Sequence, residues 1–312
     1  MIVSASRRTD IPAFYSDWFF KRIEEGFVCT RNPMNIHQIS KILINPDIVD
    51  CFVFWTKNPI HFMKKLNNLS NYNYYFQYTL TGYDKLLEPN VPSVDDSIKS
   101  FQKLSKMIGN NRVIWRYDPI IITNDITIEY HKKKFEYIAS RLSGYTNKCV
   151  ISFVDYYTKT VKNMSHLNYI KVNNNQLYDL SNILNIIGNK YNISLASCAE
   201  EIDLKNQGID HGKCIDDKLI EEISGYELKI SKDKTQRDEC GCVASIDIGA
   251  YNTCPHGCVY CYANYDLNQV RRNYTQHNIN SELLYGKVSD DDKVTLRKVQ
   301  SCKIIQQSLF KK

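Results

Sequence analysis

Residues 51–59, with the sequence CFVFWTKNP, give the clearest sign of the fold. The first five are apolar, mostly aromatic or β-branched, and the polar Thr56, Lys57 and Asn58 follow them. A short run of this kind is typical of a strand that is buried on both faces of a parallel sheet. Five similar runs occur before residue 200, at 2–6, 74–81, 113–117, 150–154 and 193–197.

Helical patterns separate these apolar runs. Ile98, Phe101, Leu104 and Ile108 recur at helical spacing, and Gly109 follows them as a stop signal. The other predicted helices run from Ser16 and Asp17 to Gly26, from a cap at Asp125 to Gly144, and over 177–187 to Gly188. Repeated alternation of strand and helix predicts a parallel α/β fold, either an open doubly wound sheet or a barrel.

Polar residues at the strand ends favour the barrel. The apolar runs finish in polar side chains, such as RRTD at 7–10, RYD at 116–118 and CAE at 198–200. The carboxyl ends of barrel strands meet on one face, where active sites lie. No glycine-rich phosphate loop follows a strand, which argues against a nucleotide-binding Rossmann fold. The sequence therefore predicts a partial (βα)n barrel of the TIM type with parallel strands.

The chain divides into three predicted parts. Residues 1–200 form the βα-barrel core, and 201–270 form a cysteine-rich segment with a seventh strand at 243–248. Residues 271–312 form a tail that packs on the barrel and carries nine basic against four acidic residues, a net charge of +5. A basic tail indicates contact with nucleic acid in some proteins, but an excess of this size is also common on ordinary surfaces.

The composition excludes several classes of protein. Of 312 residues, 43% are hydrophobic and 24% are charged, as in globular proteins. No apolar run approaches the roughly 20 residues that span a bilayer, and the N-terminus lacks the pattern of a secretory signal. We therefore expect a soluble cytoplasmic protein without membrane contact. Eleven cysteines in a reducing cytoplasm indicate metal binding or catalysis rather than disulfides, although Cys51 and Cys149 begin strands and are predicted core residues.

Three of the cysteines share one short loop, CPHGCVYCYAN at 254–264. The spacing Cys254-x3-Cys258-x2-Cys261, with Tyr260 before the last cysteine, resembles the signature of the radical S-adenosylmethionine (SAM) superfamily. The resemblance implies that three thiolates bind a [4Fe–4S] cluster whose open iron chelates SAM. It also implies reductive cleavage of SAM to a 5′-deoxyadenosyl radical that attacks the substrate.

A zinc ion is the alternative occupant of this loop. Both cysteine spacings suit zinc, and Cys240, Cys242 or His256 can supply a fourth ligand. Structural zinc normally holds a small module together, whereas this loop leaves the last strand of an α/β series, which favours the cluster. Pro255 and Gly257 allow the tight turns that wrap three sulfurs around one cube.

A second group of cysteines is spread over three segments. Cys198 ends the sixth strand, Cys214 follows in the polar segment, and Cys240 and Cys242 precede the seventh strand. Because these positions lie near the same predicted face, the four thiols are candidates for an auxiliary iron–sulfur cluster or a zinc ion. The alternative is that Cys198 belongs to the core and Cys214 is incidental.

Motifs along the chain are similar to those of one uncharacterised bacterial family, a domain of unknown function of about this length. They are SASRRTDIP at 4–12, FWTKNP at 54–59, RYDP at 116–119, CAE at 198–200, DIGAYN at 247–252 and the cysteine loop. The resemblance covers nearly the whole chain and implies a radical SAM-like activity without naming a substrate. Spore photoproduct lyase is a more distant likeness, through the cysteine loop and the Arg-x-x-Pro strand end.

The order of the elements departs from that of typical radical SAM enzymes. There the cysteine loop follows the first strand of a six-stranded partial barrel, whereas here it follows the last strand. We therefore expect a permuted order in which 245–249 lies beside 2–6, so that the loop still lies at the top of the barrel. The usual glycine-rich SAM motif has no clear match.

Candidate site residues follow the strand ends. Arg116 is a candidate for the SAM carboxylate, because a guanidinium forks onto carboxylates; the alternative is an ion pair with Asp118. Arg7, Arg8 and Asp10 form a predicted catalytic group for an anionic substrate or phosphate, with a solvated charge cluster as the alternative. The remaining candidates are Lys57, Gln77, Thr79 and Tyr260 for cofactor binding, Tyr117 as a relay for an electron or hydrogen atom, and, more weakly, Asp155, Tyr156 and Glu200.

These observations predict an oxygen-sensitive radical SAM enzyme that acts on an unknown small-molecule or macromolecular substrate. Such an enzyme needs a reducing electron donor such as flavodoxin or ferredoxin. One alternative is a DNA repair enzyme like photoproduct lyase. Another is a non-catalytic zinc or iron–sulfur module that binds nucleic acid, which would require an aromatic and basic surface that the sequence does not show.

Overall fold

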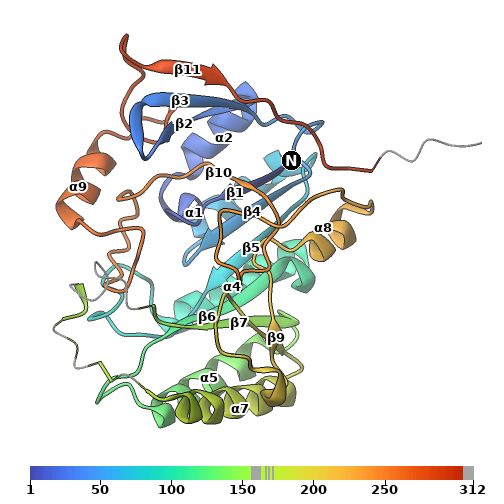
Figure 1. Cartoon of the computed structure of the whole chain (residues 1–312), viewed down its shortest axis with the longest axis vertical. Coiled ribbons are helices and arrows are strands. Elements are labelled where there is room, and N and C mark those ends of the chain that lie inside the picture. Colours follow the sequence, from blue (N-terminus) through green and yellow to red (C-terminus); the bar gives the residue numbers. More distant parts are fainter. Residues whose placement is uncertain (156–162, 166, 168, 171, 305–312) are drawn as a thin grey trace, which may run out of the picture.

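The computed structural model describes residues 1–155, 163–165, 167, 169, 170 and 172–304. Its main feature is an eight-stranded sheet of parallel strands in the order β10-β1-β4-β5-β6-β7-β8-β9 (Figure 1). The strands are β1 (Ile2–Ala5), β4 (Cys51–Thr56), β5 (Tyr74–Thr79), β6 (Val113–Ile120), β7 (Lys148–Phe153), β8 (Ser194–Ser197), β9 (Asp210–His211) and β10 (Ile246–Asp247).

The parallel α/β class is therefore confirmed, and strands form at all seven predicted stretches. β10 pairs with β1, with Val3 opposite Ile246 and Ser4 opposite Asp247, so the strand before the cysteine loop lies beside the first strand, as predicted. Within the described residues the sheet does not close into a barrel, because β10 and β9 remain its two edges. The polar strand ends cannot decide closure, since the carboxyl ends of parallel strands share one edge in an open sheet as well.

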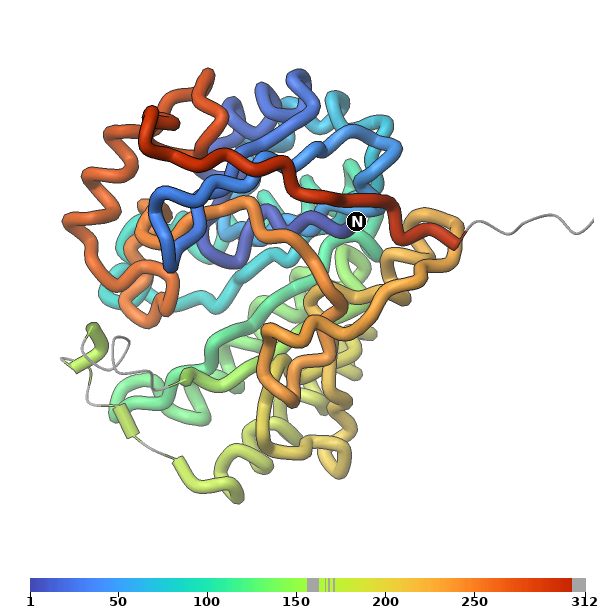
Figure 2. The backbone as a smooth tube through the Cα atoms, turned by 45° about the horizontal axis from the view of Figure 1, so that its top comes forward, coloured from blue at the N-terminus to red at the C-terminus, as the bar shows by residue number. Residues whose placement is uncertain are grey.

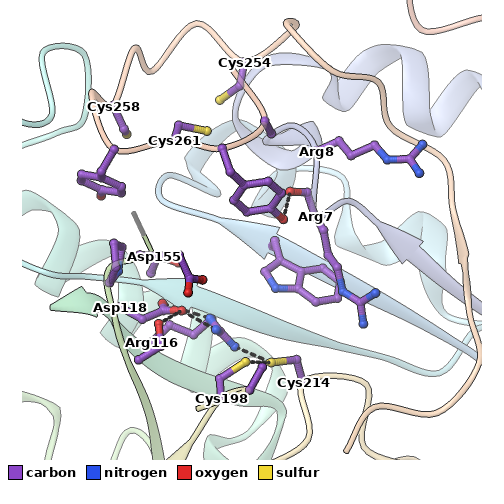
Figure 3. Close-up of a pocket in the computed structure, with 18 of the residues that line it drawn as sticks. Arg7, Arg8, Arg116, Asp118, Asp155, Cys198, Cys214, Cys254, Cys258 and Cys261 are labelled. Atoms are coloured by element: carbon purple, nitrogen blue, oxygen red, sulfur yellow. Dashed lines mark hydrogen bonds and ion pairs between the residues drawn. The ribbon is translucent and has the colours of Figure 1, made fainter. Parts of the chain in front are cut away.

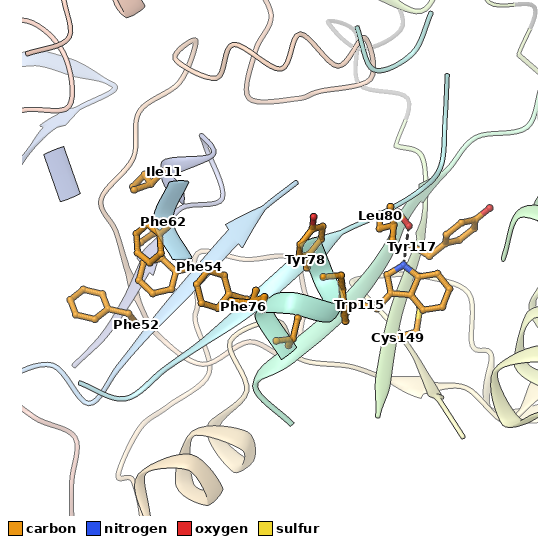
Figure 4. Packing of buried hydrophobic residues seen from close by; sticks show 14 of the residues in the cluster. Ile11, Phe52, Phe54, Phe62, Phe76, Tyr78, Leu80, Trp115, Tyr117 and Cys149 are labelled. Atoms are coloured by element: carbon orange, nitrogen blue, oxygen red, sulfur yellow. Dashed lines mark hydrogen bonds between the residues drawn. The ribbon is translucent and has the colours of Figure 1, made fainter. Parts of the chain in front are cut away.

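Most of the helices cover one face of the sheet, whereas α8 (Asp217–Ser224) packs on the other. Alternate residues of each strand point to this face, such as Phe52 and Phe54 of β4, while Cys51 and Val53 point to the other. The aromatic side chains of this face form a continuous layer that extends to Trp115 of β6 (Figure 4). The helices are α1 (Ile11–Phe14), α2 (Ser16–Glu25), α3 (Ile60–Met63), α4 (Val94–Ile108), α5 (Ile128–Leu142), α7 (Asn174–Lys190), α8 (Asp217–Ser224) and α9 (Leu267–Thr275), with 3-10 helices η1 (Leu66–Leu69), η2 (Asn110–Arg112) and η3 (Lys205–Gln207). None of the helices in the described part of the chain has the length and apolarity needed to cross a membrane.

The cysteine-rich segment after β9 covers the opposite face. Val53 and Tyr75 of the sheet pack there with Ile215, Ile220 and Val243. Figure 2 shows this part of the chain, coloured yellow to orange, lying against one side of the strands. Apolar side chains are therefore buried on both faces of the sheet without closure of a barrel.

A second, three-stranded sheet has the order β11-β3-β2, and the sequence patterns do not predict it. β2 (Phe27–Asn32) and β3 (Asn35–Leu43) form an antiparallel hairpin, and β11 (Lys293–Leu296) pairs with β3 in parallel. Most residues of these strands are half-buried or exposed, so the continuous apolar runs of the main sheet are missing. The predicted division of the chain near residues 200 and 270 stays a prediction, and the end of the predicted tail, 305–312, lies outside the described residues.

Two predicted helix ends are wrong. The cap of α5 is Thr127 and not Asp125, because the Thr127 side chain accepts a hydrogen bond from the backbone N–H of Tyr130. α7 continues past Gly188, which serves packing instead of ending the helix. A Cβ on Gly188 would lie 2.3 Å from Leu195 Cδ1, so the missing side chain lets α7 approach β8 closely.

Candidate active site

A cavity of about 420 Å³ lies at the carboxyl ends of the strands, between the cysteine loop and the segment that precedes β10 (Figure 3). All seven predicted metal ligands line it: Cys198, Cys214, Cys240, Cys242, Cys254, Cys258 and Cys261. Arg7, Arg8, Asp10, Lys57, Thr79, Arg116 and Tyr260 line it as well, whereas Gln77 and Tyr117 do not.

Asp247 holds in place the strand that leads into the cysteine loop. Its carboxylate accepts hydrogen bonds from Ser4 Oγ and Ser6 Oγ, both at 2.7 Å, from the Arg7 N–H at 2.8 Å and from the Gly249 N–H at 2.9 Å. Because Ser4 lies in β1 and Ser6 and Arg7 directly follow it, this one side chain joins the end of β10 to the end of β1. The joint brings residues far apart in sequence to the same edge of the sheet.

Hydrogen bonds define the conformation of the cysteine loop. The Asn264 side chain accepts from the Cys254 N–H at 3.4 Å and donates to the Cys254 carbonyl oxygen at 2.6 Å. Asn90 Nδ2 donates to the carbonyl oxygen of Pro255 at 2.8 Å. Gly257 has a φ of +70°, a left-handed conformation that favours glycine. The loop thereby presents its three cysteines to one side of the cavity (Figure 3).

Asp10, a predicted catalytic residue, connects three segments of the chain. One carboxylate oxygen accepts from the Ala13 N–H at 2.9 Å and caps α1, while the other accepts from the Lys57 N–H at 2.7 Å. The second oxygen also lies 2.8 Å from His256 Nε2 in the cysteine loop. Asp10 and His256 are both buried. The Asp10 carboxylate is thus occupied by the protein's own groups and positions the loop.

Lys57 lies in a buried network with Glu88, which no sequence pattern marks. The Lys57 ammonium is 2.8 Å from Glu88 Oε1, and that oxygen also accepts from Thr81 Oγ1 at 2.8 Å and from the Tyr260 hydroxyl. Burial opposes charge on both groups, but their mutual attraction outweighs it, so the pKa of Glu88 is lowered and the pKa of Lys57 is raised. Both groups are charged, and Glu88 holds Tyr260 against the cavity.

Arg116 is bonded to neighbours in the cavity wall. Its Nε donates to one carboxylate oxygen of Asp118 at 3.1 Å and its Nη2 donates to the other, so the strand-end ion pair forms. Its Nη1 donates to Gln77 Oε1 at 3.3 Å and to Cys214 Sγ at 2.8 Å. Gln77 Nε2 in turn donates to the Cys214 carbonyl oxygen at 2.9 Å. Arg116 and Gln77 therefore brace the segment that carries Cys214.

The two arginines after β1 point in different directions (Figure 3). The Arg7 guanidinium lies 5.4 Å from the ring centroid of Trp55, and its Nη2 atom is buried without a hydrogen-bond partner among the described residues. The Arg8 guanidinium lies 4.9 Å from the ring centroid of Tyr251. The predicted group of Arg7, Arg8 and Asp10 is therefore not a single cluster of side chains.

Tyr117 lies in the hydrophobic core and not at the cavity. Its hydroxyl is 2.9 Å from His131 Nδ1, and His131 Nε2 is 2.9 Å from the carbonyl oxygen of Ile121. Burial raises the pKa of Tyr117 well above its ordinary range and lowers the pKa of His131 to about 4. The alternation of β6 places Tyr117 on the helix-covered face, which explains why the predicted relay does not reach the cavity.

The second predicted group of cysteines does come together. The Sγ atoms of Cys198 and Cys214 are 3.1 Å apart, and the Cys214 N–H donates to Cys242 Sγ at 3.3 Å. Cys240, two residues before Cys242, lines the same cavity. All eleven cysteines are free thiols, and Cys51 and Cys149 are buried in strands, as predicted. Within the described residues, no group of three or more His, Cys, Asp or Glu side chains is placed to hold a metal ion as it stands.

The weaker candidates lie at the ends of β7 and β8. Asp155 forms an ion pair with Arg237. Glu200 accepts from the Phe153 N–H at 2.8 Å, and burial raises the pKa of Glu200 to about 8. Tyr156 lies outside the described residues.

Comparisons with known proteins place the chain in a family. Over residues 2–263 the sequence matches the family described as domain of unknown function DUF1848, so the chain belongs to that family. No curated protein matches the chain. One similar solved structure is a provisionally assigned alpha-L-fucosidase from Bacteroides thetaiotaomicron VPI-5482, with 13% identity, coverage of 73% of this chain and 82% of that chain, and a TM-score of 0.26. A likeness of that size carries no argument about this protein.

Proposed function

We propose that this member of the DUF1848 family is a radical SAM enzyme. Cys254, Cys258 and Cys261 would hold its [4Fe–4S] cluster, and bound cluster and SAM would supply a 5′-deoxyadenosyl radical for hydrogen abstraction. The observation that supports this most strongly is that one tight loop presents all three cysteines to a cavity of about 420 Å³. The cavity lies at the carboxyl ends of parallel strands, where α/β enzymes bind their ligands.

The donor set suits an iron–sulfur cluster better than a single zinc ion. With Zn–S bonds of ~2.3 Å, a tetrahedral zinc site needs four ligands whose sulfurs lie ~3.8 Å apart. The cysteine loop brings three thiolates to the cavity, one short of that set. A cube of four irons is larger and takes one thiolate per iron, so three thiolates leave one iron for another ligand. His256, the histidine of the zinc alternative, is already bonded to Asp10.

The protein's own residues would position the ligands and limit access of water. Tyr260 of the cysteine loop, held by Glu88, forms part of the cavity wall. Asp10 holds the loop through His256. We assign Arg116 to bracing the Cys214 segment and not to the SAM carboxylate, because its donors already have partners.

We also propose that the main sheet is a partial barrel. From β1 through β4, β5, β6, β7 and β8, neighbouring strands of the main sheet follow the chain order without reversal. A doubly wound sheet reverses its strand order at a switch point, so the observed order supports a partial barrel. The proposed cytoplasmic enzyme would receive electrons from a reduced flavodoxin or ferredoxin.

The test is anaerobic purification with analysis of iron and sulfide, followed by incubation with SAM and dithionite. We expect about four irons per chain and formation of 5′-deoxyadenosine. Cys258→Ala should lose both, whereas Cys302→Ser, which alters a thiol that does not line the cavity, should keep both. Zinc at the loop, no iron–sulfur chromophore and no cleavage of SAM would refute the proposal.

A further inference from the structure

We propose that Cys198, Cys214, Cys240 and Cys242 form a second metal centre that binds a single tetrahedral thiophilic cation, Zn²⁺. The four residues come from three segments: the end of β8, the loop after β9, and the turn before β10. All four line the cavity, and Figure 3 shows Cys198 and Cys214 on the side opposite the cysteine loop. This site is independent of the proposed radical chemistry.

Three of the four cysteines are already in contact with one another. Cys198 Sγ is 3.1 Å from Cys214 Sγ. Cys242 Sγ accepts hydrogen bonds from the backbone N–H groups of Cys214 at 3.3 Å and Ile215 at 3.4 Å. Cys240 and Cys242 flank Gly241, and both line the cavity. Four thiols from distant parts of the sequence thus meet without forming a disulfide.

The surroundings of these sulfurs are rich in donors. Besides the two backbone N–H groups, Arg116 Nη1 donates to Cys214 Sγ at 2.8 Å. The Arg7 guanidinium lies close enough to Cys214 and Cys242 to interact with both electrostatically, and its Nη2 has no partner among the described residues. Hydrogen bonds and positive charges stabilise thiolates, and a zinc ion with four thiolates keeps a net negative charge that these groups would offset.

Two glycines allow the cysteine-bearing turns to touch. A Cβ on Gly241 would lie 3.0 Å from Lys213 Cγ and 3.3 Å from the Gly212 carbonyl oxygen. A Cβ on Gly212 would lie 2.9 Å from Ala196 Cβ. Close approach of the two turns therefore depends on glycine at 212 and 241, each next to or near a cysteine ligand.

The spacing favours one ion over a second cluster. Tetrahedral zinc with bonds of ~2.3 Å separates its sulfurs by ~3.8 Å, so Cys198 and Cys214 need to open by only ~0.7 Å. An iron–sulfur cube would require a larger separation of the four thiols. Each thiol that binds zinc releases its proton to solvent.

The experiment uses the full chain with Cys254→Ala, Cys258→Ala and Cys261→Ala, so that the proposed iron–sulfur loop has no ligands. We expect about one zinc per chain after desalting. Adding Cys214→Ser and Cys240→Ser should reduce bound zinc at least tenfold, whereas adding Cys302→Ser should leave it unchanged. Iron with sulfide in the triple variant, or zinc retained without Cys214 and Cys240, would overturn the proposal.

A second measurement protects the test from misfolded variants. The chain that lacks the three loop cysteines is stripped with a chelator and titrated with Co²⁺, which should give the intense visible bands and sulfur-to-metal charge transfer of a tetrahedral thiolate site. One equivalent of Zn²⁺ should abolish these bands and raise the melting temperature. Weak octahedral bands only, or a melting temperature that zinc does not change, would contradict a site at this tetrad. Because neither readout involves SAM, the radical SAM proposal can fail while this one stands.

Discussion

The joint between β10 and β1 can be tested by adding a single methyl group. In Gly249→Ala the new Cβ would lie 2.1 Å from Ser6 Oγ, 2.6 Å from Ser6 Cβ and 3.1 Å from Thr9 Cγ2. Ordinary carbon–carbon contacts are ~3.5–4.0 Å. The overlap with Ser6 Cβ is therefore about 1 Å, and because that atom is attached to the backbone, a rotamer change cannot relieve it.

Overpacking of this kind costs about 1–3 kcal/mol of unfolding free energy. With an unfolding entropy of ~2.1 cal/mol/K per residue, a chain of 312 residues loses about 1.5 °C of Tm per kcal/mol. We therefore expect Gly249→Ala to melt about 2–5 °C below the wild type, measured by circular dichroism at constant protein concentration.

A double-mutant cycle with Ser6→Gly identifies the cause. Ser6→Gly removes both close atoms of residue 6, and it also removes the hydrogen bond to Asp247, a cost that the single variant measures separately. The Gly249→Ala penalty should shrink by about 1 kcal/mol or more in the Ser6→Gly background. An unchanged Tm in Gly249→Ala, or the same penalty in both backgrounds, would refute the described docking of β10 on β1.

Two further predictions concern buried charge. Burial lowers the pKa of His131 from 6.5 to about 4, so between these pH values the folded protein binds fewer protons than the unfolded chain. The contribution of His131 to the free energy of unfolding is therefore full above pH 6.5 and falls by about 3 kcal/mol as the pH drops to 4. His131→Gln should flatten that part of the stability profile in urea unfolding, and identical pH slopes would contradict the assignment. Glu88→Gln leaves the Lys57 ammonium buried without its counter-charge and should cost about 3–5 kcal/mol. Lys57→Met with Glu88→Leu should recover only part of this loss, because the hydroxyls of Thr81 and Tyr260 lose their acceptor. Wild-type stability in Glu88→Gln alone would show that the pair is not buried.

Local signals were sufficient for seven of the eight strands of the main sheet, and only the two-residue, exposed β9 was not predicted. Short apolar runs mark strands that are buried on both faces, because every residue of such a strand contacts other protein groups. The strands of the small sheet lack this signal: β3 is exposed over residues 35–38, and β11 is exposed throughout. Gly188 shows the same limit in a helix, since its role depends on Leu195 of a later strand and not on its helical neighbours.

The residues of the candidate site likewise differ in how far away in the sequence their partners lie. The spacing of Cys254, Cys258 and Cys261 points to a shared site because the three residues lie close together in one turn-rich loop. The ion pair of Arg116 with Asp118 is similarly local. By contrast, the partners of Asp10 are at positions 57 and 256, and Glu88 meets Tyr260 across 172 positions of the chain.

The sequence by itself determined the parallel α/β class, the main strands and the cysteine loop, because periodicity and spacing are properties of neighbouring residues. The pairing of the strand before the loop with the first strand was expected only from the resemblance to radical SAM enzymes, and the structure confirms that pairing. Only the tertiary structure decided that the sheet stays open in the described chain, that Tyr117 faces the core, and that four dispersed cysteines meet. These outcomes depend on which surfaces cover the two faces of the sheet, and such long-range packing leaves no periodic pattern in the chain.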